Sequence, residues 1–192
     1  MESNGVLVVG GGMVGAALAV DLGRRGIPVR VLEAHPPKPL TGDEPLRLRV
    51  SALNRRSISY LEEIGAWSAL QPGRLADFDE VLTWDVSGSG RLHFSAEELG
   101  LERLGVFIEN EHLQATLLDV ARSQSAVQLD APAPTLDIEP GDSGPRLELA
   151  GEGTLDPGLV VAADGAASPL RDAAGIRVWE GDYGQHAVVA TV

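Results

Sequence analysis

The fold is decided near the N-terminus, by the stretch "GVLVVGGGMVG" at residues 5–15. Its first half is an unbroken apolar run rich in β-branched residues, which is typical of a strand buried on both faces of a parallel sheet. Residues 13–25 continue at helical spacing, Gly26 ends that pattern, and residues 27–33 form a second apolar run. The sequence therefore predicts a βαβ unit with a right-handed crossover.

Three glycines in this stretch have the spacing of a phosphate-binding loop between a strand and a helix. Gly10 permits the tight turn, Gly12 lets the backbone approach a phosphate, and Gly15 lets the helix pack closely on the sheet. The N-terminus of the helix offers N–H groups and a partial positive charge to a pyrophosphate. Glu33 ends the second strand, where a carboxylate can accept hydrogen bonds from ribose hydroxyls. These residues predict an ADP-ribose site; the alternative is a glycine-rich turn followed by a surface glutamate.

The bulk composition excludes several classes of function. The chain has 192 residues, a formal net charge of −13 and no cysteine. An acidic chain offers no basic surface to the phosphates of a duplex, so nucleic acid is not an expected partner. Without cysteine there is no thiolate nucleophile, disulfide or Cys-ligated metal site. The four histidines lie far apart and show no metal-ligand spacing, so no metal site is predicted.

The remaining segments alternate between apolar runs and turn-rich loops. Residues 35–45 and 130–145 are rich in proline, glycine and acidic residues and predict loops, the second with one short strand around Leu136. Further predicted elements, in chain order, are a helix over 51–70, a hairpin over 80–94, a strand over 106–108, a helix from Asn110 to about Arg122, and strands over 146–150 and 186–192.

A second motif stands in the stretch "LVVAADGAASPLR", residues 159–171. It predicts a buried strand, an acidic turn and a short helix that ends in an arginine. Asp164 and Gly165 can close a turn beside a cofactor, and Arg171 can brace that turn from the helix. An ordinary strand–turn–helix with an Asp cap is the alternative. The glycine loop alone does not distinguish FAD from NAD, but a nicotinamide dehydrogenase does not need this second element, so the pair favours a flavin.

Three segments, 46–67, 106–121 and 159–176, resemble the ubiquinone-biosynthesis hydroxylases. These belong to the class A flavoprotein aromatic monooxygenases, which include p-hydroxybenzoate hydroxylase. The combination of "RVSALN", "EN..L" and "ADGA.S..R" carries the resemblance, which extends over nearly the whole chain. It implies an α/β fold, with a Rossmann-like FAD/NAD(P)-binding domain on a parallel sheet and the start of a β-rich substrate domain.

The resemblance also implies an enzyme that binds FAD and inserts one oxygen atom from O₂ into an aromatic ring, with NAD(P)H as reductant. The flavin carries the chemistry, and the protein supplies position, a dry pocket and electrostatics. No residue is predicted to be catalytic. The cofactor-binding residues implied by matching positions are Gly10, Gly12, Gly15, Glu33, Arg49, Asn110, Asp164 and Gly165.

Two of these residues have plausible simpler roles. Arg49 forms an Arg-x-Arg pair with Arg47 and resembles the arginine that lies along the cofactor; the alternative is a surface arginine. Asn110 stands where the family places an amide at a helix start near the pyrophosphate; the alternative is a simple helix N-cap. Asp164 and Gly165 resemble the acidic turn that the family links to both FAD and reductant binding.

The resemblance implies a discontinuous domain organisation. Residues 1–75 and 100–180 are expected to form the FAD-binding domain, and residues 76–99 and 181–192 the first strands of an incomplete substrate domain. In the family, the second half carries a Gly-Asp-Ala-Ala-His type motif and most of the substrate pocket, and that motif does not occur in this sequence. We therefore expect this 192-residue form to be inactive alone and to bind FAD weakly or not at all.

Alternative functions and several partners stay open. A flavin-dependent reductase or halogenase shares both motifs, and a non-catalytic nucleotide-binding module is a third hypothesis. The expected substrate is aromatic, with a polyprenylated phenol as one candidate. The sequence begins without a leader pattern, so a cytoplasmic protein is expected, with peripheral association at the inner membrane or in a biosynthetic complex as a further hypothesis. An unpaired final strand would favour self-association through an open sheet edge.

Overall fold

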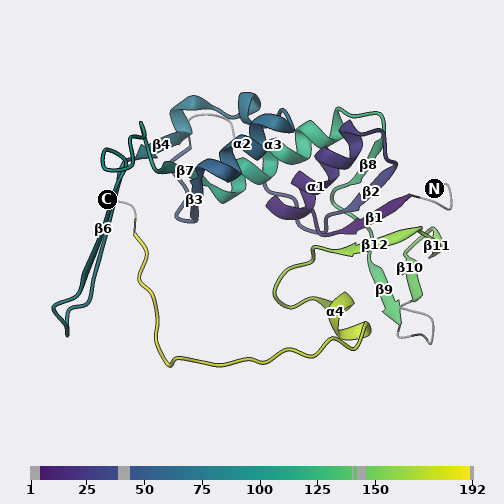
Figure 1. Cartoon of the computed structure of the whole chain (residues 1–192). Coiled ribbons are helices and arrows are strands. Elements are labelled where there is room, and N and C mark those ends of the chain that lie inside the picture. The colour runs from purple at the N-terminus through teal and green to yellow at the C-terminus, as the bar shows by residue number, and fades with distance from the viewer. Residues whose placement is uncertain (1–4, 39–43, 140, 142–145, 191–192) are drawn as a thin grey trace. The chain divides into compact units, whose positions relative to one another are not determined.

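The computed structural model describes residues 5–38, 44–139, 141 and 146–190 of the chain (Figure 1). The chain folds into two compact units. Within the described residues, the first unit comprises 5–38 together with 114–190, and the second comprises 44–113. Each unit has sheets and buried side chains of its own.

The first unit is built on a four-stranded parallel sheet, and helix α1 (Met13–Arg24) connects two of its strands. In spatial order the strands are β12 (Leu159–Ala162), β1 (Val6–Val9), β2 (Val29–Leu32) and β8 (Val127–Asp130). Every neighbouring pair is parallel, and β1 aligns Val6 with Val29 on one side and with Leu159 on the other. The predicted α/β class and the predicted βαβ unit are confirmed.

The two faces of this sheet have different partners, which explains the unbroken apolar run of β1. Val6 and Val8 pack with Ala19 of α1 on one face. Leu7 packs on the other face, in a cluster with Leu147 and Leu149. A strand covered on both faces has no polar positions to alternate with, so its sequence reads as a continuous apolar run.

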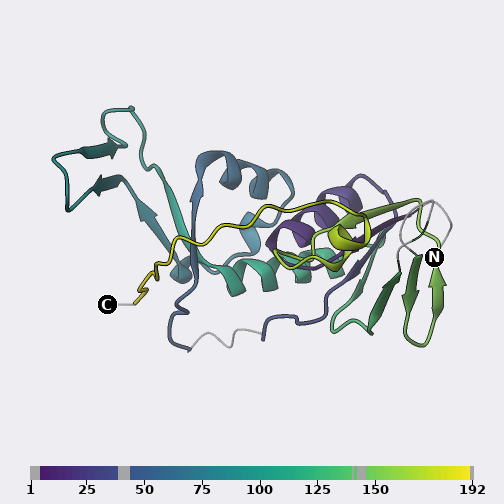
Figure 2. The same cartoon turned by 90° about the horizontal axis from the view of Figure 1, so that it is seen from below.

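A small antiparallel sheet covers the Leu7 face. It consists of β9 (Leu136–Glu139), β10 (Arg146–Leu149) and β11 (Gly153–Leu155), and Figure 2 shows its strands beside the parallel sheet. Arg30 of β2 is buried between the two sheets, where its Nε donates to Asp130 at 2.6 Å and its Nη2 donates to Glu152 at 2.6 Å. The bonds to Glu152 and Asp130 raise the pKa of Arg30 above its ordinary value. They tie the turn before β11 to the parallel sheet.

The second unit contains a three-stranded antiparallel sheet. Its elements are β3 (Val50–Asn54), α2 (Arg55–Glu63), two short 3-10 turns (Trp67–Ala69 and Pro72–Arg74), β4 (Leu75–Phe78), β7 (Gly105–Glu109) and the start of α3 (Asn110–Arg122). Strand β7 lies between β3 and β4. Ile58 and Leu61 of α2 and Val106 and Ile108 of β7 are buried.

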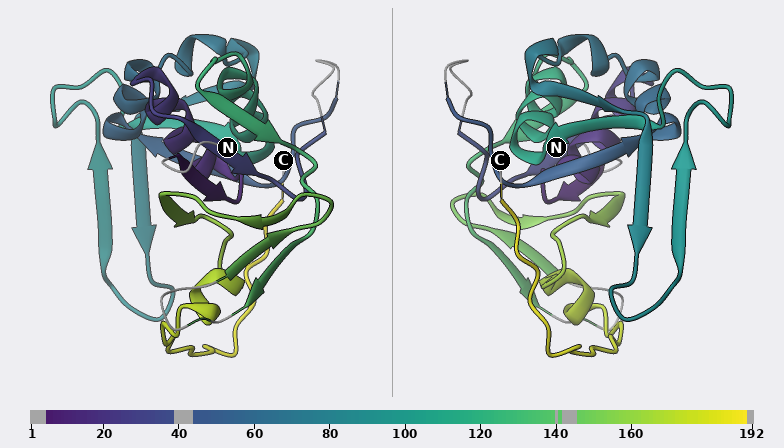
Figure 3. Two further views of the ribbon diagram at one scale, coloured as in Figure 1. Left: turned by 90° about the vertical axis from the view of Figure 1, so that its right-hand side faces the viewer. Right: turned by 90° about the vertical axis from the view of Figure 1, so that its left-hand side faces the viewer.

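A separate hairpin, β5 (Glu80–Trp84) with β6 (Arg91–Ser95), confirms the hairpin predicted over 80–94. Figure 3 shows its two strands running side by side and joined by a loop at one end. All residues of β5 are exposed, and Ser95 is the one buried residue of β6. Within the part of the chain that the structure describes, the hairpin therefore has little core of its own.

Several boundaries differ from the prediction. The helix expected over 51–70 is wrong at both ends: residues up to Asn54 pair with β7 as a strand, and α2 ends at Glu63. The side chain of Asn54 then accepts a hydrogen bond from the Ser57 N–H at 2.9 Å and caps α2. The strand expected over 186–192 is also wrong: residues 186–190 are irregular and exposed, and 191–192 lie outside the described residues. Parts of the predicted loops, at 39–43, 140 and 142–145, likewise lie outside them.

Strands β4, β8 and β11 were not predicted. Each is three or four residues long and gains its ladder from a distant partner, so local periodicity gives little signal. None of the described helices is long and apolar enough to cross a membrane.

Candidate cofactor-binding site

The glycine loop joins β1 to α1 in the way its spacing predicts. Gly10 has φ +101, a conformation that side chains rarely adopt, and a Cβ there would collide with the carbonyl of Ala163. A Cβ on Gly15 would collide with the carbonyl oxygen of Gly10. A Cβ on Gly12, in contrast, would meet no described atom within 4 Å. Gly10 and Gly15 are thus required by packing, whereas Gly12 borders open space.

That open space lies at the N-terminus of α1. Gly12 is the N-cap residue, it provides no side-chain cap, and the first turn of the helix carries no acidic residue. The first N–H groups of the helix are therefore directed at space that a side chain does not fill. Backbone donors and the helix dipole together favour an anion, so this cradle fits a pyrophosphate.

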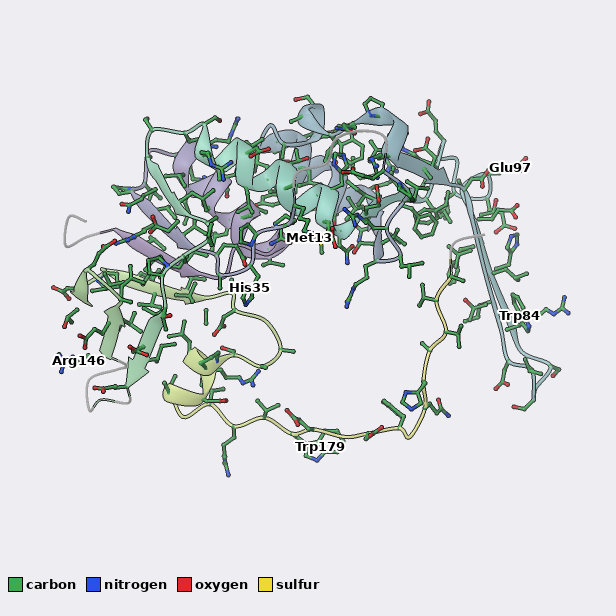
Figure 4. All side chains as sticks on the ribbon, turned by 180° about the vertical axis from the view of Figure 1, so that it is seen from behind. Met13, His35, Trp84, Glu97, Arg146 and Trp179 are labelled. Atoms are coloured by element: carbon green, nitrogen blue, oxygen red, sulfur yellow. The ribbon has the colours of Figure 1, made fainter. Side chains whose placement is uncertain are left out.

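Glu33 is fixed against the loop. Its Oε2 accepts a hydrogen bond from the Gly11 N–H at 2.7 Å, and its Oε1 accepts one from the His35 N–H at 2.7 Å. The residue is 9% exposed, so it is not the ordinary surface glutamate of the alternative interpretation. Each carboxylate oxygen can accept a further bond, and such a pair of acceptors suits ribose hydroxyls. Figure 4 labels Met13, the first residue of α1, and His35, which follows β2 in the chain.

Helix α3 also contacts the loop, through a residue that the sequence did not single out. The Gln114 Nε2 donates to the Gly11 carbonyl at 3.0 Å. Leu118 is also close to the same glycine, since a Cβ on Gly11 would approach its side chain to 3.1 Å. The loop is thus held from β2 and from α3, and its shape does not depend on a bound ligand.

The acidic turn lies directly against the glycine loop. The Ala163 N–H donates to the Val9 carbonyl at 2.8 Å, and the Ala163 carbonyl fills the space beside Gly10. Gly165 has φ +89, which explains why the turn needs a glycine there. The Asp164 Oδ2 accepts from the Leu170 N–H at 3.3 Å. Two motifs about 150 residues apart in the sequence are therefore neighbours in the first unit.

A short helix, α4 (Pro169–Ala173), closes the turn. The Ser168 Oγ accepts from the Arg171 N–H at 3.0 Å and caps it, while the Arg171 Nη1 donates to the Ala166 carbonyl at 2.7 Å. The arginine thus braces the turn from the helix, as predicted. A hollow of about 510 Å³ opens between β12 and α4, with Asp164, Ser168 and Arg171 among an otherwise mostly apolar lining.

Arg49 and Asn110 belong to the second unit, and the structure brings them together. The Asn110 N–H donates to the Arg49 carbonyl at 3.0 Å, which continues the ladder between β3 and β7. The Asn110 Oδ1 accepts from the Ser51 hydroxyl at 2.6 Å. The Arg49 side chain is exposed, and among the described residues it makes no hydrogen bond or ion pair. The exposed Arg49 guanidinium can therefore donate hydrogen bonds to a ligand.

A buried ion pair directly precedes Asn110, and sequence reasoning missed it. The Arg74 Nη1 donates to both carboxylate oxygens of Glu109, at 2.8 and 2.7 Å, and the Arg47 N–H donates to Oε1 at 2.6 Å. Burial raises the pKa of Glu109, but the bonds from Arg47 and Arg74 outweigh it, so the pKa lies below its ordinary value. The signal available in the sequence was a glutamate at an inward-facing position of the apolar run "VFIE".

His112 lies in the next turn of α3 and is also buried. Its Nε2 accepts a hydrogen bond from the Gln71 N–H at 3.0 Å, which requires that nitrogen to be unprotonated. Burial lowers the pKa of His112, Glu109 opposes this shift, and Arg74 adds to it. Among the described residues no group of three or more His, Cys, Asp or Glu side chains could hold a metal ion.

The geometry agrees with what the comparisons with known proteins find. A family described as "FAD binding domain" matches residues 4–191. A 3-demethoxyubiquinol 3-hydroxylase of Escherichia coli is 35% identical over 97% of this chain and 48% of its own length. The ubiquinone hydroxylase UbiL of Rhodospirillum rubrum is 33% identical over 97% of this chain and 43% of its own length. The mitochondrial ubiquinone biosynthesis monooxygenase COQ6 of the rat is 32% identical over 97% of this chain and 42% of its own length. The chain thus spans less than half the length of these relatives.

Solved structures show the same fold at lower identity. PqsL, a probable FAD-dependent monooxygenase of Pseudomonas aeruginosa, has a TM-score of 0.72 and 22% identity, over 94% of this chain and 48% of its own. The flavin-dependent monooxygenase PieE, solved in complex with FAD and substrate, has a TM-score of 0.64 and 19% identity, over 91% of this chain and 32% of its own. Both likenesses concern the arrangement of strands and helices.

Proposed function

This chain belongs to the FAD-binding domain family, and from that premise we propose that it supplies the FAD-binding part of an aromatic-ring hydroxylase of ubiquinone biosynthesis. The observation that carries the proposal is the contact between the glycine loop and the acidic turn, made where a Cβ on Gly10 would overlap the Ala163 carbonyl. A lone glycine loop would suit any dinucleotide, whereas this pair suits a flavin. The ubiquinone hydroxylases among the relatives support the choice of pathway.

Different residues of this chain are proposed to bind different parts of FAD. In our proposal, the N–H groups at Gly12 and the start of α1 hold the pyrophosphate, and Glu33 binds the hydroxyls of the adenosine ribose. Asp164 and Gly165 form a second wall, and Arg49 and Asn110 remain proposed cofactor-binding residues, with a guanidinium and an amide to offer. FAD, when bound, supplies the redox chemistry, with O₂ as oxidant and NAD(P)H as reductant. The chain itself binds the cofactor, orients it and excludes water from one side of it.

The substrate is proposed to be aromatic, in the form of a phenol that carries a polyprenyl chain. The names of two relatives, a 3-demethoxyubiquinol 3-hydroxylase and a ubiquinone hydroxylase, support this substrate class. The domain organisation stays as predicted in this proposal, with 1–75 and 100–180 forming the FAD-binding domain and with 76–99 and 181–192 contributing to a substrate domain. The exposed hairpin β5–β6 lies within residues 76–99, in the region proposed to contribute to the substrate domain.

We also propose that the protein associates with other surfaces. The hairpin exposes a set of large apolar side chains, which favours contact with a further protein surface or with the inner membrane. These side chains are Val81, Leu82, Trp84, Leu92 and Phe94. Figure 4 labels Trp84 on this hairpin and Trp179 on the extended segment that follows α4.

A flavin titration of the 192-residue chain tests the cofactor assignment. Because this 192-residue form is expected to bind FAD weakly, the quenching of FAD fluorescence should need a high FAD concentration. ADP should compete for the same site, because the loop addresses only the ADP half. ADP carrying a 2′-phosphate should compete poorly, because the buried Glu33 carboxylate repels it. If neither FAD nor ADP binds at millimolar concentration, this chain does not form the site on its own.

The hydroxylase assignment has a separate test. With FAD bound and the chain supplied with the remaining part of a relative, a prenylated phenol should be converted to a product one oxygen atom heavier, with oxidation of one NAD(P)H per product. Flavin binding without that product, once the chain is supplied with the remaining part of a relative, would favour a reductase instead.

A further inference from the structure

We infer that Glu109 is a positioning residue: its buried carboxylate fixes the segment 44–49 and thereby sets the place of the Arg49 guanidinium. The inference rests on the proposed function, in which Arg49 is a cofactor-binding residue. It adds to that function a residue which contacts no ligand itself and acts through its neighbours.

The segment 44–49 needs such an anchor, because it lies outside the strand ladder, which begins at Val50. Three hydrogen bonds hold its main chain. The Arg47 N–H donates to the Glu109 Oε1 at 2.6 Å, and the Glu44 carbonyl accepts from the Arg74 Nη2 at 2.8 Å. The third is the bond from the Asn110 N–H to the Arg49 carbonyl at 3.0 Å. Two of the three therefore depend on the pair formed by Glu109 and Arg74.

Both side chains of the pair are buried. The Glu109 side chain is 2% exposed and the Arg74 side chain 6%. A buried ion pair contributes little to stability compared with apolar residues of the same volume, so its retention is better explained by geometry than by stability. Here the geometry is specific: the carboxylate accepts two bonds from one guanidinium and one from the main chain of the segment.

Glu109 also couples the two residues assigned to the cofactor. It immediately precedes Asn110, and it holds the Arg47 N–H two residues before Arg49. The Glu109 side chain thus fixes the main chain of the segment 44–49 relative to the start of α3. Fixing that course before binding reduces the conformational entropy lost when the Arg49 side chain engages a ligand.

The test compares three variants of the 192-residue chain. Glu109→Gln keeps the shape and removes the charge. The double variant Arg74→Met with Glu109→Leu replaces the buried ion pair with apolar side chains, so no buried charge is left unpaired. It also leaves the Arg47 N–H without its acceptor. Glu111→Gln is the control, because that carboxylate lies two residues away on α3, is about half exposed and reaches only the Arg47 Nε at 3.5 Å.

Amide hydrogen exchange of residues 44–49 is the first measurement, because it needs no ligand. In the double variant the Arg47 amide has lost its acceptor and should exchange about tenfold faster or more, while the amides of α2 stay as protected as in the wild type. In Glu109→Gln, whose amide oxygen can still accept the bond, the Arg47 amide should exchange faster than in the wild type by a smaller factor. The control should match the wild type throughout. Equal exchange at Arg47 in all four proteins would overturn the inference.

Flavin affinity is the second measurement, because a role in stability alone would not affect it in the same way. We expect both Glu109 variants to bind FAD about tenfold more weakly, even though the double variant unfolds at nearly the wild-type urea concentration. Recovery of FAD affinity in the double variant, in step with its stability, would overturn the positioning role. If the wild-type chain binds no FAD, it does not form the cofactor site on its own, and the exchange comparison still decides the inference.

Discussion

Replacing Gly12 with alanine is expected to abolish most of the affinity for FAD and leave the fold intact. Gly12 has φ −62 and ψ 176, which alanine adopts freely, and no described atom lies within 4 Å of the added methyl group. Alanine is a poorer N-cap than glycine, and it also restricts the unfolded chain; each effect amounts to about 0.5–1 kcal/mol, with opposite signs. The free energy of unfolding should therefore change by less than about 0.5 kcal/mol.

The methyl group would stand where a phosphate must approach the backbone. Losing one hydrogen bond from a main-chain N–H to a charged phosphate costs about 2 kcal/mol, which corresponds to roughly a 30-fold weaker Kd. Gly15→Ala makes the contrast, because its Cβ would overlap the Gly10 carbonyl and approach the Ala163 Cβ to 3.0 Å. That substitution should destabilise the fold by about 3 kcal/mol through overpacking.

Two assays separate these effects. Urea unfolding followed by circular dichroism gives the stability, and fluorescence titration with FAD, with ADP as competitor, gives the affinity. Gly73→Ala is the matched control, because a Cβ there also meets nothing within 4 Å but lies in the second unit. Unchanged FAD and ADP affinity in Gly12→Ala would refute the placement of the pyrophosphate at this loop.

Three further predictions concern the fold. Leu7→Ala removes a fully buried side chain between the two sheets and should lower the free energy of unfolding by about 3 kcal/mol, measured by urea unfolding. Stability should fall as the pH drops below about 6.5, because burial lowers the pKa of His112 in the folded state and the unfolded chain then binds more protons; His112→Gln should flatten this slope in urea midpoints measured from pH 7.5 to 5. Arg30→Met should speed amide exchange in β11, and equal exchange there would show that the bonds to Glu152 and Asp130 do not hold that sheet.

The glycine loop was predictable because each of its parts is local. An apolar run, three glycines at fixed spacing and a helical pattern follow one another within residues 5–25. The contact between this loop and the acidic turn at Asp164 could be expected only from the pairing of two motifs. Its atomic basis, the fit of the Ala163 carbonyl beside a glycine with φ +101, depends on the register of β12 against β1.

The pair of Glu109 and Arg74 could not be predicted from the sequence. The two residues are 35 positions apart, and their meeting depends on β4 pairing with β7, yet β4 itself gave no usable signal. The start of α2 was misplaced for a related reason. Residues 51–54 are compatible with a helix, but their backbone groups pair with β7 instead. The side chain of Asn54 then caps α2, so the helix begins only after this residue.

The exposed hairpin β5–β6 has a kinetic consequence. A two-stranded ribbon with almost no buried side chain is only marginally stable, so its hydrogen bonds should open and close many times for each unfolding event of the sheets. A protease should therefore cut near Ser87–Gly90 long before it cuts β1 or β7. Cleavage there would break only the loop between β5 and β6, and the other sheets would keep their strands. The hairpin loop is therefore a position at which the chain can be cut or extended without disturbing those sheets.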